Sequence, residues 1–144
     1  MEKYSETIEN YLSSIEFPAT PAMLYEPVAY SLENGGKRLR PVVVLMACHA
    51  FSADMKQALP CAAAVEMFHN FAPLHDDIID NAEISRGKSS VHKKWGRDVA
   101  ILSGDAMVIY SYKLLQQTNP AVLPSVLNEF TKTAMEVCEG QQMD

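Results

Sequence analysis

The chain has 144 residues, 48% of them hydrophobic, so it is long and apolar enough to fold as one domain, over residues 1–144, around a buried core. This composition excludes a globally disordered chain, and the net charge of −6 argues against nonspecific binding to nucleic acid. No apolar run approaches the roughly 18 residues of a membrane span, and Met1–Asn10 is too polar for a signal peptide.

The first part of the chain predicts two short helices. Apolar residues recur with helical spacing over Tyr4–Ile15, and Pro18 and Pro21 then interrupt the pattern. A second helical pattern covers Met23–Leu32. It is followed by Asn34-Gly35-Gly36, a sequence that is typical of a helix end and a turn.

The next apolar run allows two interpretations. Pro41 suits the first turn of a helix whose core is Val42–Cys48. This run is rich in β-branched residues, so a buried strand is the alternative. Its helical neighbours and the lack of a hairpin partner in the sequence favour the helix.

A long helical pattern follows Pro60 and runs through Val65 to Ile78. Pro73 lies inside it and removes one backbone hydrogen bond, so we expect a kink there. The polar segment Asn81–Ser90 predicts a loop.

Two last helices are predicted over Val99–Leu115 and Val122–Cys138, with Asn119-Pro120 as the break between them. Gly104 and Ala106 are small enough to let another helix approach the first of these closely. The patterns together predict an all-α chain of about six helices, without internal repeats.

The three cysteines, Cys48, Cys61 and Cys138, are widely spaced and form no CxxC pair. Cys48 and Cys61 lie in apolar stretches, which is typical of buried, reduced thiols. We therefore expect a cytoplasmic protein.

Three carboxylates, Asp76, Asp77 and Asp80, lie within about one helical turn at the end of an otherwise apolar helix pattern. Like charges at this spacing repel each other, and a buried helix face does not tolerate them without a partner. An all-carboxylate set suits Mg²⁺, which commonly binds one or two carboxylates together with water and phosphate oxygens. The alternative is a solvated helix end with ordinary salt bridges.

Basic residues gather at two places that suit phosphate groups. Gly35-Gly36 precedes Lys37, Arg38 and Arg40 at the start of a predicted helix, where free N–H groups and arginine favour anions. Arg86-Gly87-Lys88 follows the aspartates. Each string alone fits a solvated basic turn, whereas together with the carboxylates they indicate a site for a diphosphate.

The order and spacing of these motifs, from about Met23 to Asp144, resemble the trans-isoprenyl diphosphate synthases. The blocks that carry the resemblance are Gly35–Pro41, Phe68–Asn70, His75–Asn81, Arg86–Lys88, Ser90–His92, Ile101–Ala106 and Glu139–Asp144. The resemblance implies an isoprenoid synthase-type helical bundle, of which this chain would be the N-terminal half. It also implies a Mg²⁺-dependent prenyltransferase that condenses an allylic diphosphate with isopentenyl diphosphate, most often as a homodimer.

The resemblance assigns roles to individual residues. Asp76 and Asp80 would bind Mg²⁺, and Asp77 lies within the same catalytic motif. The remaining matches divide between two substrates. Isopentenyl diphosphate would be held by Lys37, Arg40, His69 and Arg86, and the allylic site would include Gln141 and Asp144. By the same resemblance, the residues about one turn before Asp76, here Phe71 and Ala72, limit product length, and the large ring favours C15–C20 products. The alternative is that Phe71 only packs in the core.

The chain also departs from the family pattern. Ser85 stands where family members usually carry an arginine that contacts the allylic diphosphate. The chain ends before the second aspartate-rich motif, so we expect a fragment whose activity alone is doubtful, because an open half-site would expose the allylic cation to water.

Two other interpretations remain. A catalytically inactive scaffold subunit of a prenyl synthase would keep the fold without turnover. His75-Asp76 also matches the HD dipeptide of metal-dependent phosphohydrolases, which need further His and Asp ligands. That interpretation leaves the basic block before Pro41 unexplained. His75 itself fits either a residue that supports the neighbouring aspartates or a hydrogen-bonded core histidine, and the second interpretation is favoured. His92 is interpreted as a structural capping residue.

Overall fold

The computed structural model describes residues 1–33, 36–51 and 54–144, and nearly all of its regular structure is helical. The helices are α1 (Glu2–Ser13), α2 (Ala22–Glu33), α3 (Leu39–Ala50), the 3₁₀ turn η1 (Met55–Ala58), α4 (Leu59–Ile79), α5 (Val91–Trp95), α6 (Arg97–Leu115) and α7 (Leu123–Met143). The predicted all-α class is confirmed. None of the helices described combines the length and the apolar character that crossing a bilayer requires.

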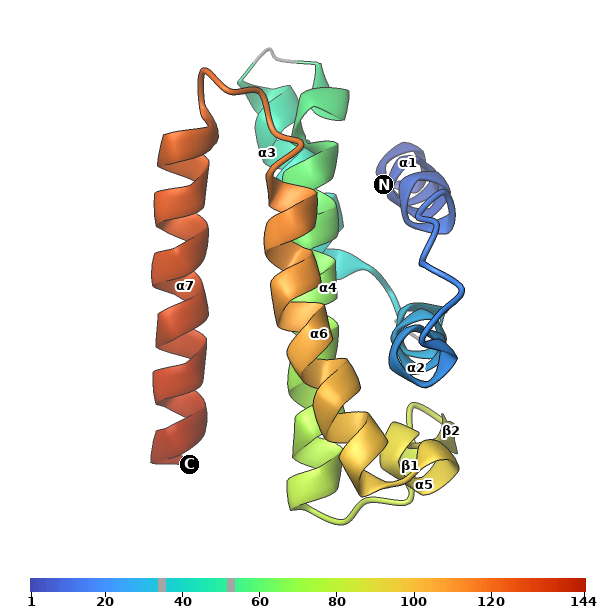
Figure 1. The fold of residues 1–144 in the computed structure, drawn as a ribbon. Helices are drawn as coiled ribbons and strands as arrows, with labels where there is room; N and C mark the ends of the chain where they lie inside the picture. The colour runs from blue at the N-terminus through green and yellow to red at the C-terminus, as the bar shows by residue number, and fades with distance from the viewer. Residues whose placement is uncertain (34–35, 52–53) are drawn as a thin grey trace.

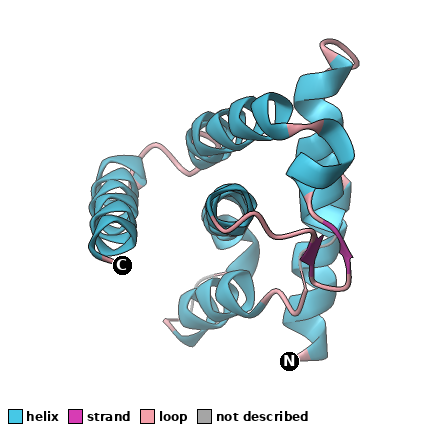
Figure 2. Ribbon diagram, turned by 90° about the horizontal axis from the view of Figure 1, so that it is seen from below, coloured by secondary structure: helices cyan, strands magenta, loops and turns pink. Residues whose placement is uncertain are grey.

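Two long helices, α4 and α6, lie side by side at the centre of the molecule and share its most extensive contact (Figure 1). α1 and α2 lie on one side of this pair, and α7 lies on the other. The view from below shows α7 set apart from the remaining helices (Figure 2), and α7 makes few contacts with α4. The centre of the fold is therefore well packed, and its α7 side is open.

The core is made of side chains that these helices direct inward. Its largest fully buried apolar members are Ile8, Leu45, Met67, Met107 and Leu115. Burying a side chain of this size stabilises the fold by about 1.5–3 kcal/mol. The strip Ala62–Ala64 on α4 is fully buried as well, and its small side chains let neighbouring helices approach closely.

The helix α4 continues through Pro73 to Ile79. Pro73 has no N–H to donate to the carbonyl of His69, so one hydrogen bond of the helix is missing there. The helix nevertheless continues beyond Pro73. Asp76 and Asp77 are still helical residues.

The segment predicted as a loop contains a short hairpin instead. The strands β1 (Ile84–Ser85) and β2 (Lys88–Ser89) pair in antiparallel fashion around Arg86-Gly87. Both turn residues have positive φ, 52° for Arg86 and 81° for Gly87, as a type I′ turn requires. The prediction of a loop over the whole segment was wrong at this point, because Arg-Gly lacks the Asn or Asp that usually announces such a turn.

Side-chain hydrogen bonds attach this hairpin to the helices. The hydroxyl of Tyr30 donates to the carbonyl oxygen of Ser89 at 2.8 Å, and Ser90 Oγ donates to the carbonyl oxygen of Ala82 at 2.8 Å. His92 Nε2 also bonds to the carbonyl of Ala82, in keeping with the structural role predicted for it. The turn that carries Arg86 is thereby held in place.

Other predictions of detail differ from the structure. The helix α5 follows the hairpin where no helix was expected, and α7 extends past the predicted end at Cys138. Asn34 and Gly35 of the predicted turn lie outside the described residues. The three cysteines are free thiols, although Cys48 and Cys61 are only partly buried.

Candidate active site

An acidic cluster lies at the C-terminal end of α4. Asp76 and Asp77 belong to the last helical turns, and Asp80 is the residue that caps the helix end. The C-terminus of a helix is the negative end of its dipole, so carboxylates there raise the free energy of the fold. A bound cation would offset both the dipole and the mutual repulsion of the three groups.

The C-terminal end of α7 contacts this acidic cluster. Gln141 Nε2, on α7, donates to Asp76 Oδ1 at 2.6 Å. Burial raises the pKa of Asp76, and the negative charges of Asp80, Asp77 and Asp144 raise it further, whereas His75 lowers it. The structure thus brings Gln141 and Asp144 to the aspartates, although Asp76 and Gln141 are 65 positions apart in the sequence.

A cavity of about 680 Å³ opens beside the acidic cluster. Its walls come from the last turns of α4 and of α7. They are formed by Phe71, Ala72, His75, Asp76, Ile79, Asp80, Val137, Cys138, Gln141, Gln142 and Asp144. One wall is therefore polar and acidic, while the ring of Phe71 supplies an apolar surface.

Asp76 and Asp80 fit Mg²⁺ by the chemistry of their oxygen atoms. In the described ranges 1–33, 36–51 and 54–144, no three His, Cys, Asp or Glu side chains are grouped closely enough to hold a metal by themselves. Mg²⁺ usually keeps water ligands and shares substrate phosphates rather than sitting in a cage of protein groups. Asp76 and Asp80 would therefore supply only part of the ligands of a bound Mg²⁺.

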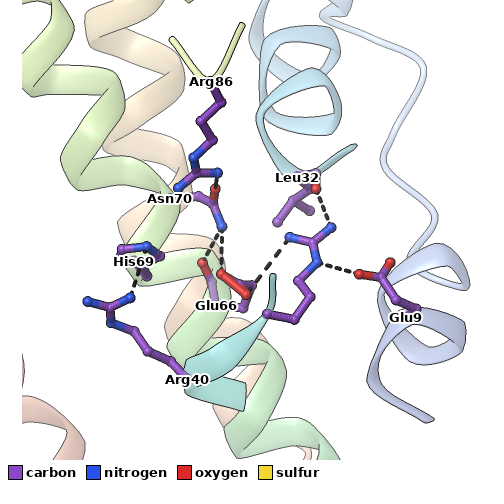
Figure 3. Close-up of polar contacts among 8 residues, drawn as sticks. Glu9, Leu32, Arg40, Glu66, His69, Asn70 and Arg86 are labelled. Carbon is purple, nitrogen blue, oxygen red and sulfur yellow. Dashed lines mark hydrogen bonds and ion pairs between the residues drawn. The ribbon is translucent and has the colours of Figure 1, made fainter. Parts of the chain in front are cut away.

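A cationic cavity of about 160 Å³ lies about two helical turns before the aspartates, where α3, α4 and the hairpin meet. Its walls are formed by Gly36, Lys37, Arg38, Leu39, Arg40, Glu66, His69 and Arg86. All four residues expected to hold isopentenyl diphosphate are among them. Figure 3 shows how three of these, Arg40, His69 and Arg86, are arranged around Glu66 and Asn70.

Arg40 and His69 contact each other in this cavity, with 3.3 Å between Arg40 Nη1 and His69 Nε2. A guanidinium group only donates, so Nε2 must accept and the ring proton lies on Nδ1. Burial lowers the pKa of His69, and the charges of Arg40 and Arg86 lower it further. Both effects favour the neutral ring of His69, in which Nδ1 carries the proton and Nε2 accepts from Arg40.

Arg38 has a structural role that its neighbours in sequence do not share. It is buried, donates to Glu9 Oε1 at 2.6 Å and to the carbonyl of Leu32, and lies 3.9 Å from Glu66 Oε2. These bonds tie α1, α2 and α4 to the start of α3 (Figure 3). The sequence alone could not separate it from Lys37 and Arg40.

Two residues beside the cationic cavity had no role assigned from the sequence: Glu66, which lies in no matching block, and Asn70, which belongs to the block Phe68–Asn70. Asn70 Nδ2 donates to Glu66 Oε1 at 3.0 Å, and Asn70 Oδ1 accepts from Arg86 Nη1 at 3.0 Å. Burial raises the pKa of Glu66, against the opposing effect of the nearby arginines and of the bond from Asn70. The signal available in the sequence was a single acid inside the apolar stretch Ala62–Phe68.

His75 faces α6. Its Nε2 lies 3.2 Å from the carbonyl oxygen of Ile101 and 3.9 Å from Asp105 Oδ1. The ring also packs edge to face on Phe71, with 5.5 Å between the ring centroids. These contacts agree with a hydrogen-bonded helix-packing histidine, and they weigh against a role as a metal ligand in an HD-type phosphohydrolase.

An apolar groove of about 630 Å³ runs between α4 and α7 and adjoins the cationic cavity at Arg40 and His69. Its floor includes Val65, Phe68 and Phe130. A chain of hydrocarbon would be compatible with such a surface.

Comparison with known proteins gives a consistent result. The family model described as polyprenyl synthetase matches residues 21–144. A geranylgeranyl diphosphate synthase from Methanosarcina mazei is 40% identical over 126 residues, which are 86% of this chain and 39% of the relative. A farnesyl diphosphate synthase from Geobacillus stearothermophilus is 38% identical, over 86% of this chain and 43% of the relative.

Solved structures agree with these relatives. A crystal structure of a geranylgeranyl pyrophosphate synthase superposes with a TM-score of 0.95 at 46% identity, over 99% of this chain and 44% of that one. The geranylgeranyl pyrophosphate synthetase from Geoglobus acetivorans gives a TM-score of 0.85 at 36% identity, over 99% of this chain and 46% of that one. The chain thus spans less than half the length of these relatives, and it belongs to the polyprenyl synthetase family.

Proposed function

We propose that this chain carries the diphosphate-binding part of a Mg²⁺-dependent trans-prenyltransferase, which joins an allylic diphosphate to isopentenyl diphosphate. The observation that supports this most directly is the arrangement on α4. An acidic helix end and a cationic cavity lie about two turns apart on one helix, with an apolar groove beside them. Two diphosphates and a hydrocarbon tail need these three surfaces.

The proposal divides the residues between two substrates. Asp76 and Asp80 hold Mg²⁺ at the allylic diphosphate, where the metal, when bound, neutralises charge on the leaving group. Gln141 and Asp144 complete this side, since they line the same cavity. The isopentenyl diphosphate is bound by Lys37, Arg40, His69 and Arg86.

The reaction begins when the bond between the allylic carbon and its diphosphate oxygen breaks and the oxygen keeps the electron pair. The double bond of isopentenyl diphosphate then forms the new carbon–carbon bond, and a proton is lost. The barrier is one of charge separation, so fixed cations near the diphosphates supply most of the stabilisation. In a closed site, apolar walls such as those of this groove would keep water from the allylic cation.

Phe71 is proposed to limit product length. Its ring lines the cavity beside Asp76 and is braced by Phe68, with 4.8 Å between the ring centroids. Relatives are named as farnesyl and geranylgeranyl diphosphate synthases, which fits products of C15–C20. Phe71→Ala should lengthen the products of an active enzyme, and an unchanged product distribution would contradict this role.

A second candidate function is a prenyl synthase-like subunit without turnover. Ser85 favours it, because an arginine is expected at this position for the allylic diphosphate. A homodimer and a cytoplasmic location belong to the proposal in either case, by analogy with the family.

Calorimetry with farnesyl and isopentenyl diphosphate, with and without Mg²⁺, tests the proposal. We expect farnesyl diphosphate to bind only with the metal and isopentenyl diphosphate to bind without it, since the second site is built from protein cations. Mg²⁺-independent binding of farnesyl diphosphate would contradict the role of the aspartates. Turnover of the two bound substrates separates the enzyme from the inactive subunit.

A further inference from the structure

Glu66 and Asn70 form a polar pair inside the core, one helical turn apart on α4. Glu66 is 1% exposed and Asn70 is 4% exposed, and their neighbours Ala63 and Met67 are fully buried. Burying a carboxylate and an amide costs free energy unless both are hydrogen-bonded. Because this buried polar pair lies beside the cationic cavity, the contacts that it makes there indicate its function.

The bonds of Asn70 leave its amide only one orientation. Its Nδ2 donates to the carbonyl oxygen of Glu66 at 2.8 Å and to Glu66 Oε1 at 3.0 Å, and its Oδ1 accepts from Arg86 Nη1 at 3.0 Å. A carboxylate only accepts and a guanidinium only donates. An amide between them satisfies both, with its donor on one side and its acceptor on the other (Figure 3).

Arg86 needs such support because it sits at the turn of the hairpin. Its φ of 52° is in the left-handed region, which disfavours residues other than glycine. A long side chain on a turn also has many rotamers. Asn70 is an acceptor on a central helix, and it follows His69, which lines the cationic cavity together with Arg86, Lys37 and Arg40.

We propose that Glu66, Asn70 and Arg86 work as one relay, in which Asn70 is the positioning residue that holds the Arg86 guanidinium toward the diphosphate of the isopentenyl substrate. Glu66 orients the Asn70 amide and does not touch the substrate. The proposal rests on the proposed function, since it deepens the role given there to Arg86.

Exchanging the two side chains tests the relay. Asn70→Asp offers Arg86 a carboxylate, but it removes the donor to Glu66 and places two carboxylates together. The double variant Glu66→Gln with Asn70→Asp restores one donor and one acceptor and keeps the net charge of the pair. We expect Asn70→Asp and Asn70→Ala each to weaken isopentenyl diphosphate binding about tenfold, and the double variant to recover most of this loss.

The control is Asn128→Asp, which makes the same charge change at an exposed position on α7. It should bind isopentenyl diphosphate as the unaltered chain does. Full affinity in Asn70→Ala would overturn the relay, because Arg86 would then not need the Asn70 acceptor. Tighter binding in Asn70→Asp would also overturn it, because a negative charge near Arg86 would then be enough. Thermal unfolding followed by circular dichroism identifies any variant that has lost its fold, and Asn70→Ala adds no buried charge.

A second readout needs no ligand. Nitrogen-15 relaxation of Arg86 Nε reports the order of its side chain, which should fall in Asn70→Ala and return in the double variant. Unchanged order in Asn70→Ala would overturn the proposal, even if binding weakened. If Arg86 loses its order as expected but the unaltered chain binds no diphosphate, the positioning role is supported and the proposed function fails.

Discussion

At the position of Asp80, a carboxylate suits the binding of a cation but lowers the stability of the helix. It caps the C-terminal end of α4, where the helix dipole disfavours a negative charge and where Asp76 adds repulsion. A residue chosen for stability alone would be neutral or basic here. The carboxylate is understandable if a cation is present during function.

Replacing Asp80 with asparagine should therefore stabilise the chain while it removes a metal ligand. We expect the free energy of unfolding to rise by about 0.5 kcal/mol, and Mg²⁺-dependent binding of farnesyl diphosphate to be lost. Denaturant unfolding and calorimetry measure the two effects. Asp98→Asn is a control of opposite sign, because Asp98 lies in the first turn of α6 and its carboxylate favours that helix end. A destabilised Asp80→Asn would contradict the argument from the dipole.

Glu66 should give the chain a distinct dependence on pH. Burial raises its pKa above the ordinary value of 4.5, so folding favours the protonated carboxyl. The contribution of Glu66 to stability is greatest below 4.5 and is lost as the pH rises through the raised pKa. The free energy of unfolding of the unaltered chain should therefore fall relative to that of Glu66→Gln as the pH increases.

Denaturant unfolding at several pH values measures this difference. Glu136→Gln removes a carboxyl that is exposed on α7 and serves as the control. The quantity to follow is the free energy of unfolding of the unaltered chain minus that of Glu66→Gln. If this quantity stays constant or becomes more positive as the pH rises, Glu66 is no more easily protonated in the folded chain than in the unfolded one.

Ser85 stands where family members usually carry an arginine, and a single substitution can restore that arginine. Ser85→Arg should tighten Mg²⁺-dependent binding of farnesyl diphosphate about tenfold, since a charge-assisted hydrogen bond contributes about 1.5–3 kcal/mol before its ordering cost. Ser89→Arg adds the same charge on the neighbouring strand and should have a smaller effect. Equal affinities for Ser85→Arg and the unaltered chain would mean that this position does not contact the substrate.

Among the elements, the crossing of α4 and α6 depends on one glycine. A Cβ added to Gly104 would lie within 3.0 Å of the His75 ring, a separation that real Cβ atoms do not show. The ring is held there by the carbonyl of Ile101 and by Phe71, so moving it would break these contacts. The small size of Gly104 predicts from the sequence that another helix can approach here, and in the structure that helix is α4.

Gly104→Ala should lower the free energy of unfolding by about 1–3 kcal/mol through overpacking. Gly140→Ala is the matched control, since Gly140 is helical and a Cβ there meets nothing within 4 Å. That substitution should stabilise α7 by up to about 1 kcal/mol. In a double-mutant cycle, His75→Ala should relieve part of the cost of Gly104→Ala. Equal stabilities of the two alanine variants would exclude the proposed clash.

The sequence predicted the helices well and the polar contacts of the site poorly. Helical spacing and prolines indicate where most helices lie, because these signals act within one or two turns. The bond between Asn70 and Arg86 joins a helix to a turn, and the bond between Gln141 and Asp76 joins the two ends of the site. Such pairs depend on how helices pack, which no local pattern records.

At the scale of the whole molecule, α7 is the helix held least firmly. Phe130 packs edge to face on Tyr112, with 5.3 Å between the ring centroids, and Gln141 bonds to Asp76 near the other end. Between these contacts lies the groove of about 630 Å³, so much of the inner face of α7 has no close neighbour in the described residues. By contrast, α4 is packed against α6 along most of its length.

Hydrogen exchange should reveal this difference as a lower opening free energy for α7 than for α4. A helix of 21 residues with few tertiary contacts has little stability of its own, because helices in proteins are stabilised mainly by packing. Its backbone amides should therefore exchange well before those of α4. Adding Mg²⁺ and farnesyl diphosphate should slow exchange in the last turns of α7, since Gln141 and Asp144 line the cavity beside Asp76. Equal protection of α7 and α4 without ligand would mean that the groove is closed in solution by contacts that the fold described here does not contain.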